Sequence, residues 1–473
     1  MREVFFVSFL YLCKLKMKSE KEIQNHDEAF LELGTKPVGR LLLKYAMPAV
    51  IAMTASSLYN IVDAIFIGQG VGPLAIAGIS LTFPVMQMTA AFGSMVGVGA
   101  STLLSVKLGE RDYDTARRIL GNVVVLNVLM GVVLGALMLC FIDPILFFFG
   151  ATEQTVSYAR DFMVVILAGN VITHLYFGSN AMLRAASQPR AAMMATIYTV
   201  ILNVMLCPLF IYWCGWGITG AALATVMSQA LVLVWQFKLF SNKRSFIRFR
   251  RGIYKLKRSI VKDSLMIGMS PFLINLTGCT VAIFINKSLL VYGNDFDVAS
   301  YGICNRFAFF FLMIVMGLTQ GMQPIVGYNY GANKADRLKS ALIKTILCCT
   351  AVVCVGFVMS LLIPRQIVSM FTTDEGLINL SVHYIRILFC TFPLIGFQIA
   401  VTNFFQSIGV VKKSIFLSLS RQLIFLIPAV LILPHYLGVD GVFWSIPVGD
   451  VAATFTSAVL FWIEMRKFKR ANA

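Results

Sequence analysis

The sequence predicts an all-α polytopic membrane protein whose twelve transmembrane helices form two six-helix bundles related as parallel repeats. Three observations support this fold class. The chain has 473 residues, of which 58% are hydrophobic and only 13% charged. Its apolar residues gather in twelve long runs, and the second six runs repeat features of the first six at a nearly constant spacing. A soluble domain carries roughly a quarter charged residues, so an ordinary cytosolic protein is excluded.

The twelve apolar runs are separated by glycine, proline or charged residues. Each is long enough for the roughly 20 residues that a helix needs to cross a bilayer. None alternates in the manner of a barrel strand, and backbone groups in lipid must be bonded internally, so we expect helices. The predicted spans cover residues 42–68, 80–106, 119–142, 162–184, 191–213, 219–240, 265–292, 299–325, 341–363, 383–408, 414–435 and 441–464.

The distribution of basic residues predicts the orientation. Lysine and arginine number 40 against 22 acidic residues, a net charge of +18. Of these 40, 35 fall in the N-terminal segment, the even-numbered loops and the C-terminal tail. Basic loops stay in the cytoplasm, so both termini are expected on the cytoplasmic side of the membrane, and no nucleic-acid partner is needed. The five lysine and arginine residues outside these segments are Arg160, Lys287, Arg306, Arg365 and Arg386.

The segments outside the spans carry separate expectations. We expect a cytoplasmic N-terminal segment over 1–40, lobes over 41–240 and 263–465, and a tail over 466–473. Residues 1–16 lack a signal-peptide cleavage pattern, so translation is expected to begin at Met17. The basic connector 241–262 interleaves aromatic and aliphatic residues. That pattern predicts an amphipathic helix on the inner leaflet, with a solvated loop as the alternative.

An internal repeat relates the two halves. Pro48 matches Pro271 at a spacing of 223 residues, and Gly99 matches Gly321 at 222. Each half has six predicted spans, so both enter the membrane from the same side, as parallel repeats do. Such a build is typical of secondary transporters, and the chain has no phosphate-binding loop that would supply another energy source.

Asp63 is the sharpest functional signal, because it is a carboxylate deep inside the first predicted span. A charge there is costly and by default marks an ion or proton path. Asn60 lies one helical turn away on the same face, and Asn180, Asn203 and Thr225 place oxygen atoms in other spans. Oxygen ligands suit Na⁺ as well as a proton relay, and interhelical hydrogen bonding is the structural alternative for each.

The second half carries amides where the first has its carboxylate. We interpret these amides as substrate-binding groups, and the prolines of the repeat, Pro48 and Pro271, as hinges that bend the first helix of each lobe. The ten cysteines show no paired spacing typical of a metal site, so no metal or cofactor is expected. The amides are Asn286, Gln320, Gln323, Asn403 and Gln406.

Together these segments resemble the MATE (multidrug and toxic compound extrusion) family, in particular its MepA-like bacterial branch. The resemblance covers roughly residues 38–465 and rests on YNIVDAIFIG, SNAMLRA, GITGAALAT, GLTQGMQPIVGYNYGA, FFQSIG and RQ in this order. It implies a V-shaped pair of six-helix bundles that exports organic, often cationic, drugs across a bacterial inner membrane in exchange for H⁺ or Na⁺. We also expect a monomer, and we expect Tyr59, Gln87 and Phe177 to be further substrate-binding residues.

The resemblance carries over the ion site residue by residue. Asp63 corresponds to the family's coupling acid, and Asn203 and Thr225 to polar members of its site. A second family acid falls on Cys207, where this chain has a neutral thiol. One carboxylate binds a bare Na⁺ poorly but still carries a proton, so we expect H⁺ coupling, with Na⁺ at Asp63 as the alternative. A lipid-linked precursor flippase of the same fold superfamily is the alternative function. An intramembrane enzyme is not expected, because no catalytic motif is present.

Overall fold

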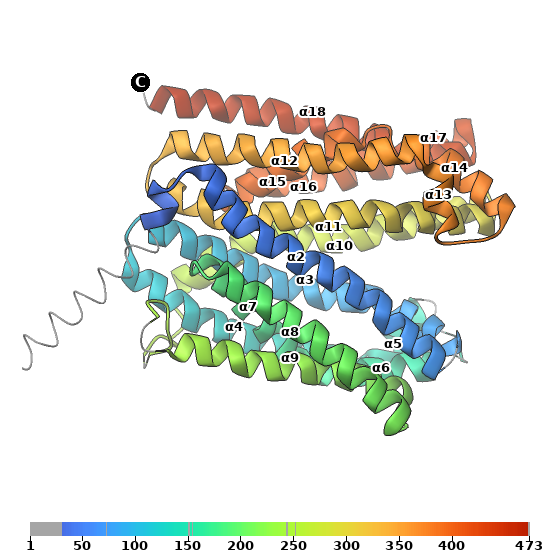
Figure 1. Cartoon of the computed structure of the whole chain (residues 1–473), viewed down its shortest axis with the longest axis horizontal. Coiled ribbons are helices and arrows are strands. Elements are labelled where there is room, and N and C mark those ends of the chain that lie inside the picture. The colour runs from blue at the N-terminus through green and yellow to red at the C-terminus, as the bar shows by residue number, and fades with distance from the viewer. Residues whose placement is uncertain are drawn as a thin grey trace, which may run out of the picture.

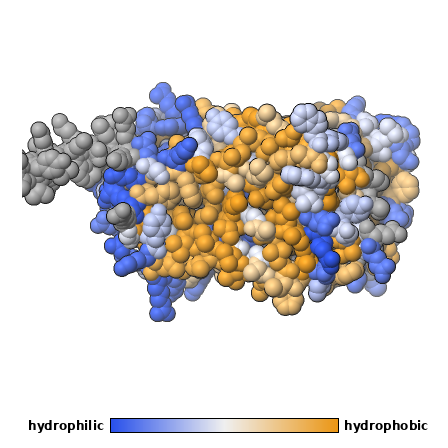
Figure 2. All heavy atoms as spheres, turned by 90° about the horizontal axis from the view of Figure 1, so that it is seen from below, coloured by the Kyte–Doolittle hydropathy of each residue, from blue (hydrophilic) through white to orange (hydrophobic). Residues whose placement is uncertain are grey.

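The computed structural model describes residues 31–71, 73–149, 152–153, 155–242, 245–250 and 252–471. The expected start at Met17 lies outside these residues. The described chain is helical throughout its spans, and the helices run roughly side by side along one direction (Figure 1). An apolar band crosses the visible face, with hydrophilic residues at both ends, as a membrane protein requires (Figure 2).

Ten described helices are long and apolar enough to cross a membrane, and two bent pairs raise the number to twelve. Each predicted span coincides with one of these helices or pairs, and three of them run one or two residues past the helix end. The first lobe comprises α2 (Val38–Gly70), α3 (Pro73–Gly109), α4 (Tyr113–Cys140), α5 (Ile142–Phe148), α6 (Val156–Ala168), α7 (Asn170–Ala185), α8 (Pro189–Pro208), η1 (Leu209–Trp213) and α9 (Gly217–Ser241). The second lobe comprises α10 (Arg258–Tyr292), α11 (Asp295–Gly331), α12 (Ala335–Leu362), α13 (Pro364–Ser369), α14 (Glu375–Phe389), α15 (Phe392–Ser407), α16 (Val411–Leu419), η2 (Ser420–Leu426), α17 (Ile427–Leu437) and α18 (Val439–Ala471).

The fourth span of each lobe is bent, which the sequence did not predict. Helices α6 and α7 meet at 56°, and α14 and α15 meet at 47°. The breaks lie at Gly169 and at Cys390 and Thr391. By contrast, α2 and α10 remain continuous helices through the proposed hinges Pro48 and Pro271.

The fifth span of each lobe contains a short π-helix. In the first lobe, α8 ends at Pro208 and continues into η1. In the second, η2 lies between α16 and α17, just before Pro428. Such wider turns often occur at functional sites in membrane and soluble helices.

Between Asn242 and Arg258, the described residues of the connector do not form the predicted amphipathic helix. Residues 245–250 are irregular, residues 252–254 form a turn, and α10 begins only at Arg258. Asn122 of α4 explains the difference, because its side chain bonds the backbone that a helix would pair internally. Its Nδ2 donates to the carbonyl oxygens of Ile253 (3.4 Å) and Lys255 (3.3 Å), and its Oδ1 accepts from the amide of Lys257 (3.0 Å).

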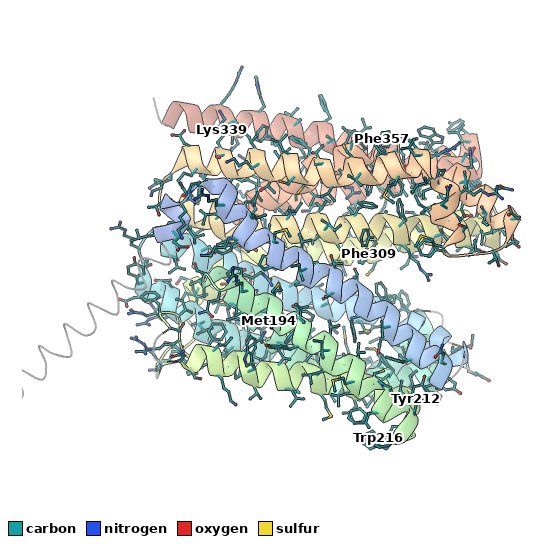
Figure 3. The ribbon with its side chains drawn as sticks, in the orientation of Figure 1. Met194, Tyr212, Trp216, Phe309, Lys339 and Phe357 are labelled. Atoms are coloured by element: carbon teal, nitrogen blue, oxygen red, sulfur yellow. The ribbon has the colours of Figure 1, made fainter. Side chains whose placement is uncertain are left out.

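The two lobes meet at the end of the molecule that carries the basic loops 107–118, 184–190 and 334–344, here called the basic end. One hydrophobic cluster at this end mixes both lobes, for example Leu104 with Met322 and Tyr45 with Phe404. Two further clusters, in contrast, each draw on a single lobe. Lys339 marks the basic end, whereas Tyr212 and Trp216 lie at the opposite end (Figure 3). Helices α2 and α11 diverge towards that opposite end (Figure 1).

Glycines allow the lobes to approach backbone to backbone at the basic end. A Cβ on Gly109 would lie 2.0 Å from the carbonyl oxygen of Tyr328, and one on Gly331 would lie 2.1 Å from that of Val106. Gly109 and Gly331 are 222 residues apart, and so are their partners Val106 and Tyr328. These contacts are therefore reciprocal and follow the internal repeat. The repeat found in the sequence is therefore a structural pseudo-symmetry.

The segment before α2 adds polar contacts between the lobes. The carbonyl oxygen of Leu33 accepts hydrogen bonds from Asn329 Nδ2 (2.9 Å) and Arg337 (3.1 Å), and that of Gly34 accepts one from Lys334 Nζ (2.8 Å). Deeper in the interface, Gln323 of α11 donates to Ser101 Oγ of α3 at 3.0 Å. The structure is thus closed at its basic end.

Candidate functional site

The candidate ion site lies inside the first lobe, between α2, α8 and α9. Helix α2 supplies Tyr59 and Asp63, α8 supplies Asn203 and Cys207, and α9 supplies Thr225. Asn203 and Cys207 are one turn apart on α8, and Cys207 is the last residue before the proline that ends this helix. The three helices are distant from one another in the sequence, so the fold brings their polar groups together.

Asp63 is half-buried, and its side-chain partner is a thiol. Cys207 Sγ donates to Asp63 Oδ1 over 3.4 Å, and Cys207 itself is fully buried. The carboxylate therefore has a weak neutral donor where the family resemblance leads one to expect a second acid. Tyr212 of η1 fixes the next turn of α2, because its hydroxyl donates to the carbonyl oxygen of Phe66 at 3.2 Å.

The hydroxyl of Thr225 is the centre of the remaining polar contacts. It donates to the carbonyl oxygen of Ala221 (3.2 Å) and accepts from Asn203 Nδ2 (3.1 Å). The Tyr59 hydroxyl lies 3.1 Å from the same oxygen. Tyr59, which we predicted to bind substrate, therefore contacts the candidate ion site in this structure.

Asn180 bonds to residues of α7 and α8. Asn180 Oδ1 accepts from Arg184 at 2.5 Å, and its Nδ2 donates to Thr196 Oγ1 at 3.3 Å. Asn180, Thr196 and Arg184 lie in the halves of α7 and α8 nearer the basic end. The side chain of Asn60 lies outside the described residues.

The predicted substrate-binding residues are dispersed over both lobes. Gln323 is buried, and its amide nitrogen contacts the hydroxyls of α3. Gln320 Nε2 lies 3.7 Å from Met53 Sδ of α2, and Asn403 Nδ2 donates to the carbonyl oxygen of Ile399 in its own helix. Of the others, Gln406 is buried, Gln87 is half-buried, and Phe177 and Asn286 are exposed.

An ion pair in the second lobe was missed in the sequence. Arg421 was counted with the cytoplasmic loops, but the structure places it in η2, inside the eleventh span. Its Nε donates to Asp450 Oδ1 of α18 at 2.8 Å, and Asp450 is only 3% exposed. Gln422, the next residue of η2, accepts a hydrogen bond from Thr277 of α10. Asp450 could have been recognised from the sequence by the criterion that identified Asp63, because it is a carboxylate inside an apolar span.

No cluster of three or more histidine, cysteine or acidic side chains suited to a metal occurs among the residues that the structure describes. The first-lobe site holds one carboxylate, one thiol, one amide and two hydroxyls. Chemically, such a group can gain and lose one proton and can offer neutral oxygen atoms to a small cation.

Comparison with known proteins settles the family. The family model described as MatE matches residues 48–209 and 267–431, which together are more than half of the chain. The chain is a member of the MATE family. The two matched segments correspond to the two lobes, and this family consists of transporters rather than enzymes. The family resemblance, the fold class and the multi-pass membrane character predicted from the sequence are confirmed.

Individual MATE proteins resemble the chain over nearly its whole length. It is 26% identical over 436 residues to the multidrug export protein MepA of Staphylococcus haemolyticus, covering 92% of this chain and 96% of that protein. A structure of an outward-facing multidrug resistance MATE transporter matches with a TM-score of 0.88 at 26% identity, covering 93% and 98% of the two chains. The MATE multidrug transporter DinF-BH, in a structure with a bound ligand, is 35% identical, with a TM-score of 0.86 and coverage of 92% and 98%.

Proposed function

We propose that this MATE protein exports amphipathic, often cationic, organic compounds across a bacterial cytoplasmic membrane in exchange for H⁺. The observation that carries the proposal is the Asp63 carboxylate, held inside the first span against the thiol of Cys207. The multidrug export named for MepA and the multidrug transport named for DinF-BH support this substrate class.

Protonation of Asp63 is the coupling step. Charged Asp63 accepts a hydrogen bond from Cys207 and so links α2 to α8, whereas the neutral acid loses most of that attraction. Helix α2 also contacts the second lobe, because Gly321 packs on Ala46 and Gly317 packs on Val50. A change at Asp63 thus acts on the helix that holds the lobes together, which couples proton binding to alternating access.

The donor set favours H⁺ over Na⁺. A bare Na⁺ prefers several oxygen ligands that include compensating negative charge. Here Cys207 replaces the second acid, and the Thr225 oxygen already accepts from Asn203 and lies beside the Tyr59 hydroxyl. Asp63 therefore carries the proton, and the hydrogen bonds among Asn203, Thr225 and Tyr59 hold the neighbouring side chains in place.

The remaining assignments are part of the same proposal. Both termini face the cytoplasm, since the basic end carries most of the positive charge, and the protein acts as a monomer built from the two lobes. Substrate passes between the lobes, and the amides of the second lobe contact its polar groups. Gln323 instead contributes to closing the basic end, because it bonds across the interface to α3.

Dye efflux from proteoliposomes tests the proposal, with a pH gradient or a Na⁺ gradient imposed separately. We expect wild-type protein to transport dye with the pH gradient alone and Asp63→Asn to lose transport while still inserting. Asp114→Asn is the matched control, because the Asp114 side chain is 92% exposed. Full transport by Asp63→Asn, or transport driven equally by Na⁺ alone, would contradict the proposal. Movement of a fluorescent lipid-linked precursor without dye efflux would favour the flippase.

A further inference from the structure

Besides Arg421, five basic residues lie outside the basic loops, and two of them have acidic partners among the residues that the structure describes. Arg160 pairs with Asp143, and Arg365 pairs with Glu375. Arg386 lies on α14 and has no acidic partner within 4.0 Å among the residues that the structure describes. An exposed, unpaired guanidinium at this end of the molecule is available to bind an anion.

Arg386 borders a hollow between α14 and the beginning of α18. The hollow has a volume of about 470 Å³ and is lined by Asn379, Val382, His383, Arg386, Ile387 and Trp444. Asn379, His383 and Arg386 lie on one exposed face of α14. His383 Nε2 is 3.2 Å from Asp440 Oδ1, so the nearby acid is engaged by the histidine. Arg386 is the positive group left in the hollow.

The depth of the hollow in the membrane follows from α18. This helix lies at the edge of the second lobe (Figure 1), and its exposed stripe begins at Trp444 and ends at Trp462. Arg466 stacks on Trp462 at 3.5 Å, near the basic end. The two tryptophans are 18 residues apart, or about 27 Å along a helix, close to the thickness of the hydrocarbon core. Tryptophan favours the interface, so the hollow lies at the boundary opposite the basic end.

An apolar path runs from the hollow towards the centre of the membrane. Between the tryptophans, the exposed stripe of α18 consists of Val448, Val451, Phe455 and Val459. A phospholipid has the matching shape, with a phosphate at the boundary and acyl chains below it. A free phosphate ion matches only the charged part of this surface.

We propose that the hollow binds an anionic phospholipid of the leaflet opposite the basic end. Arg386 binds the phosphate in a bidentate fashion, Trp444 packs on the glycerol region, and an acyl chain follows Val448 and Val451. A phospholipid with a single negative charge and no headgroup cation is the best match, because a choline or ethanolamine cation would be repelled by Arg386. The site is independent of Asp63 and of the coupling ion.

Native mass spectrometry of the full chain in mild detergent, titrated with dioleoyl phosphatidylglycerol, tests the proposal. We expect Arg386→Gln to weaken binding of the first lipid about tenfold or more, because a charge-assisted bidentate contact is lost. Trp444→Leu should weaken it as well. Arg365→Gln is the control, since it removes an equal charge at the same end that is already paired with Glu375.

The outcomes distinguish the possible ligands. Supporting results are the selective loss with Arg386→Gln, weaker binding of dioleoyl phosphatidylcholine, and no competition by inorganic phosphate. Equal lipid binding by Arg386→Gln and wild type would overturn the proposal. Displacement of the lipid by millimolar inorganic phosphate would also overturn it, because the hollow would then be a free-phosphate site.

Discussion

Replacing Gly268 by alanine perturbs the closed basic end at the crossing of α3 and α10. A Cβ at Gly268 would lie 1.8 Å from the carbonyl oxygen of Met95, which is backbone and cannot rotate away. On the other side of the same crossing, a Cβ on Gly99 would lie only 1.9 Å from the carbonyl oxygen of Ser264. The helices must therefore separate to admit a methyl group. Overpacking of this kind costs about 1–3 kcal/mol.

We expect that cost to fall on the closed conformation, on the hypothesis that α3 and α10 separate at this crossing when the basic end opens. At about 1.4 kcal/mol per decade, the equilibrium shifts roughly 5- to 140-fold away from closure. Maleimide labelling of a cysteine at Ser105 reports this shift, since Ser105 is 2% exposed and lies under Gly327 in the closed interface. The background chain has its exposed native cysteines replaced by serine. We expect Gly268→Ala to accelerate labelling by that factor and to reduce efflux.

Gly278→Ala is the matched control on the same helix, because a Cβ there would meet nothing within 4 Å. It should label at the wild-type rate. If Gly268→Ala and Gly278→Ala label equally slowly, close packing of α3 on α10 does not hold the basic end closed, and the reasoning fails.

Three further predictions concern charged groups. Cys207→Asp places a second carboxylate beside Asp63, and two such groups cannot both stay charged without a cation. A Na⁺ gradient should therefore begin to drive dye efflux. Unchanged ion dependence of efflux would count against the proposed ion site. Arg421→Met leaves Asp450 as a lone buried charge and should destabilise the protein by about 3–5 kcal/mol in thermal unfolding, whereas adding Asp450→Leu should restore most of it. Lys36 and Lys44 lower the pKa of Glu32 below 4.5, so these ion pairs stabilise the fold above pH 4.5 and are lost as the pH falls through the lowered pKa. The difference in unfolding free energy between wild type and Glu32→Gln, followed by thermal unfolding, should be small, under about 1 kcal/mol, and should shrink as the pH falls below 4.5; a difference that grows on acidification would refute this.

The sequence predicted the spans and the repeat well, because both depend on composition along a single helix. Apolar length, with glycine and proline between runs, identifies a span without knowledge of its neighbours. Gly109 and Gly331 lie at matching positions of the repeat and make reciprocal contacts between the lobes. A glycine that recurs in both halves indicates a position where a side chain would not fit. Asp63 was found because a carboxylate in an apolar run is conspicuous.

Partners across helices were harder to predict. The Thr225 hydroxyl joins Tyr59 and Asn203 only through the packing of three helices, and no spacing in the sequence encodes it. The preferred helix for the connector was wrong for its described residues before Arg258, and the distant Asn122 bonds the backbone of Ile253, Lys255 and Lys257 there. Asp450 was overlooked although the criterion that identified Asp63 applies to it equally.

The spacing of Trp444 and Trp462 gives α18 a fixed length of apolar surface, about 27 Å, to match against the bilayer. In a thicker membrane this helix must tilt less or thin the lipids around it, and in a thinner one it must tilt more, at a fraction of a kcal/mol per ångström of mismatch. Asp450 lies on the same helix, 6 residues after Trp444 and 12 before Trp462. The acyl-chain length of the lipids therefore affects the tilt of the helix that carries Asp450, the partner of Arg421. We expect the thickness of the host membrane to influence this ion pair.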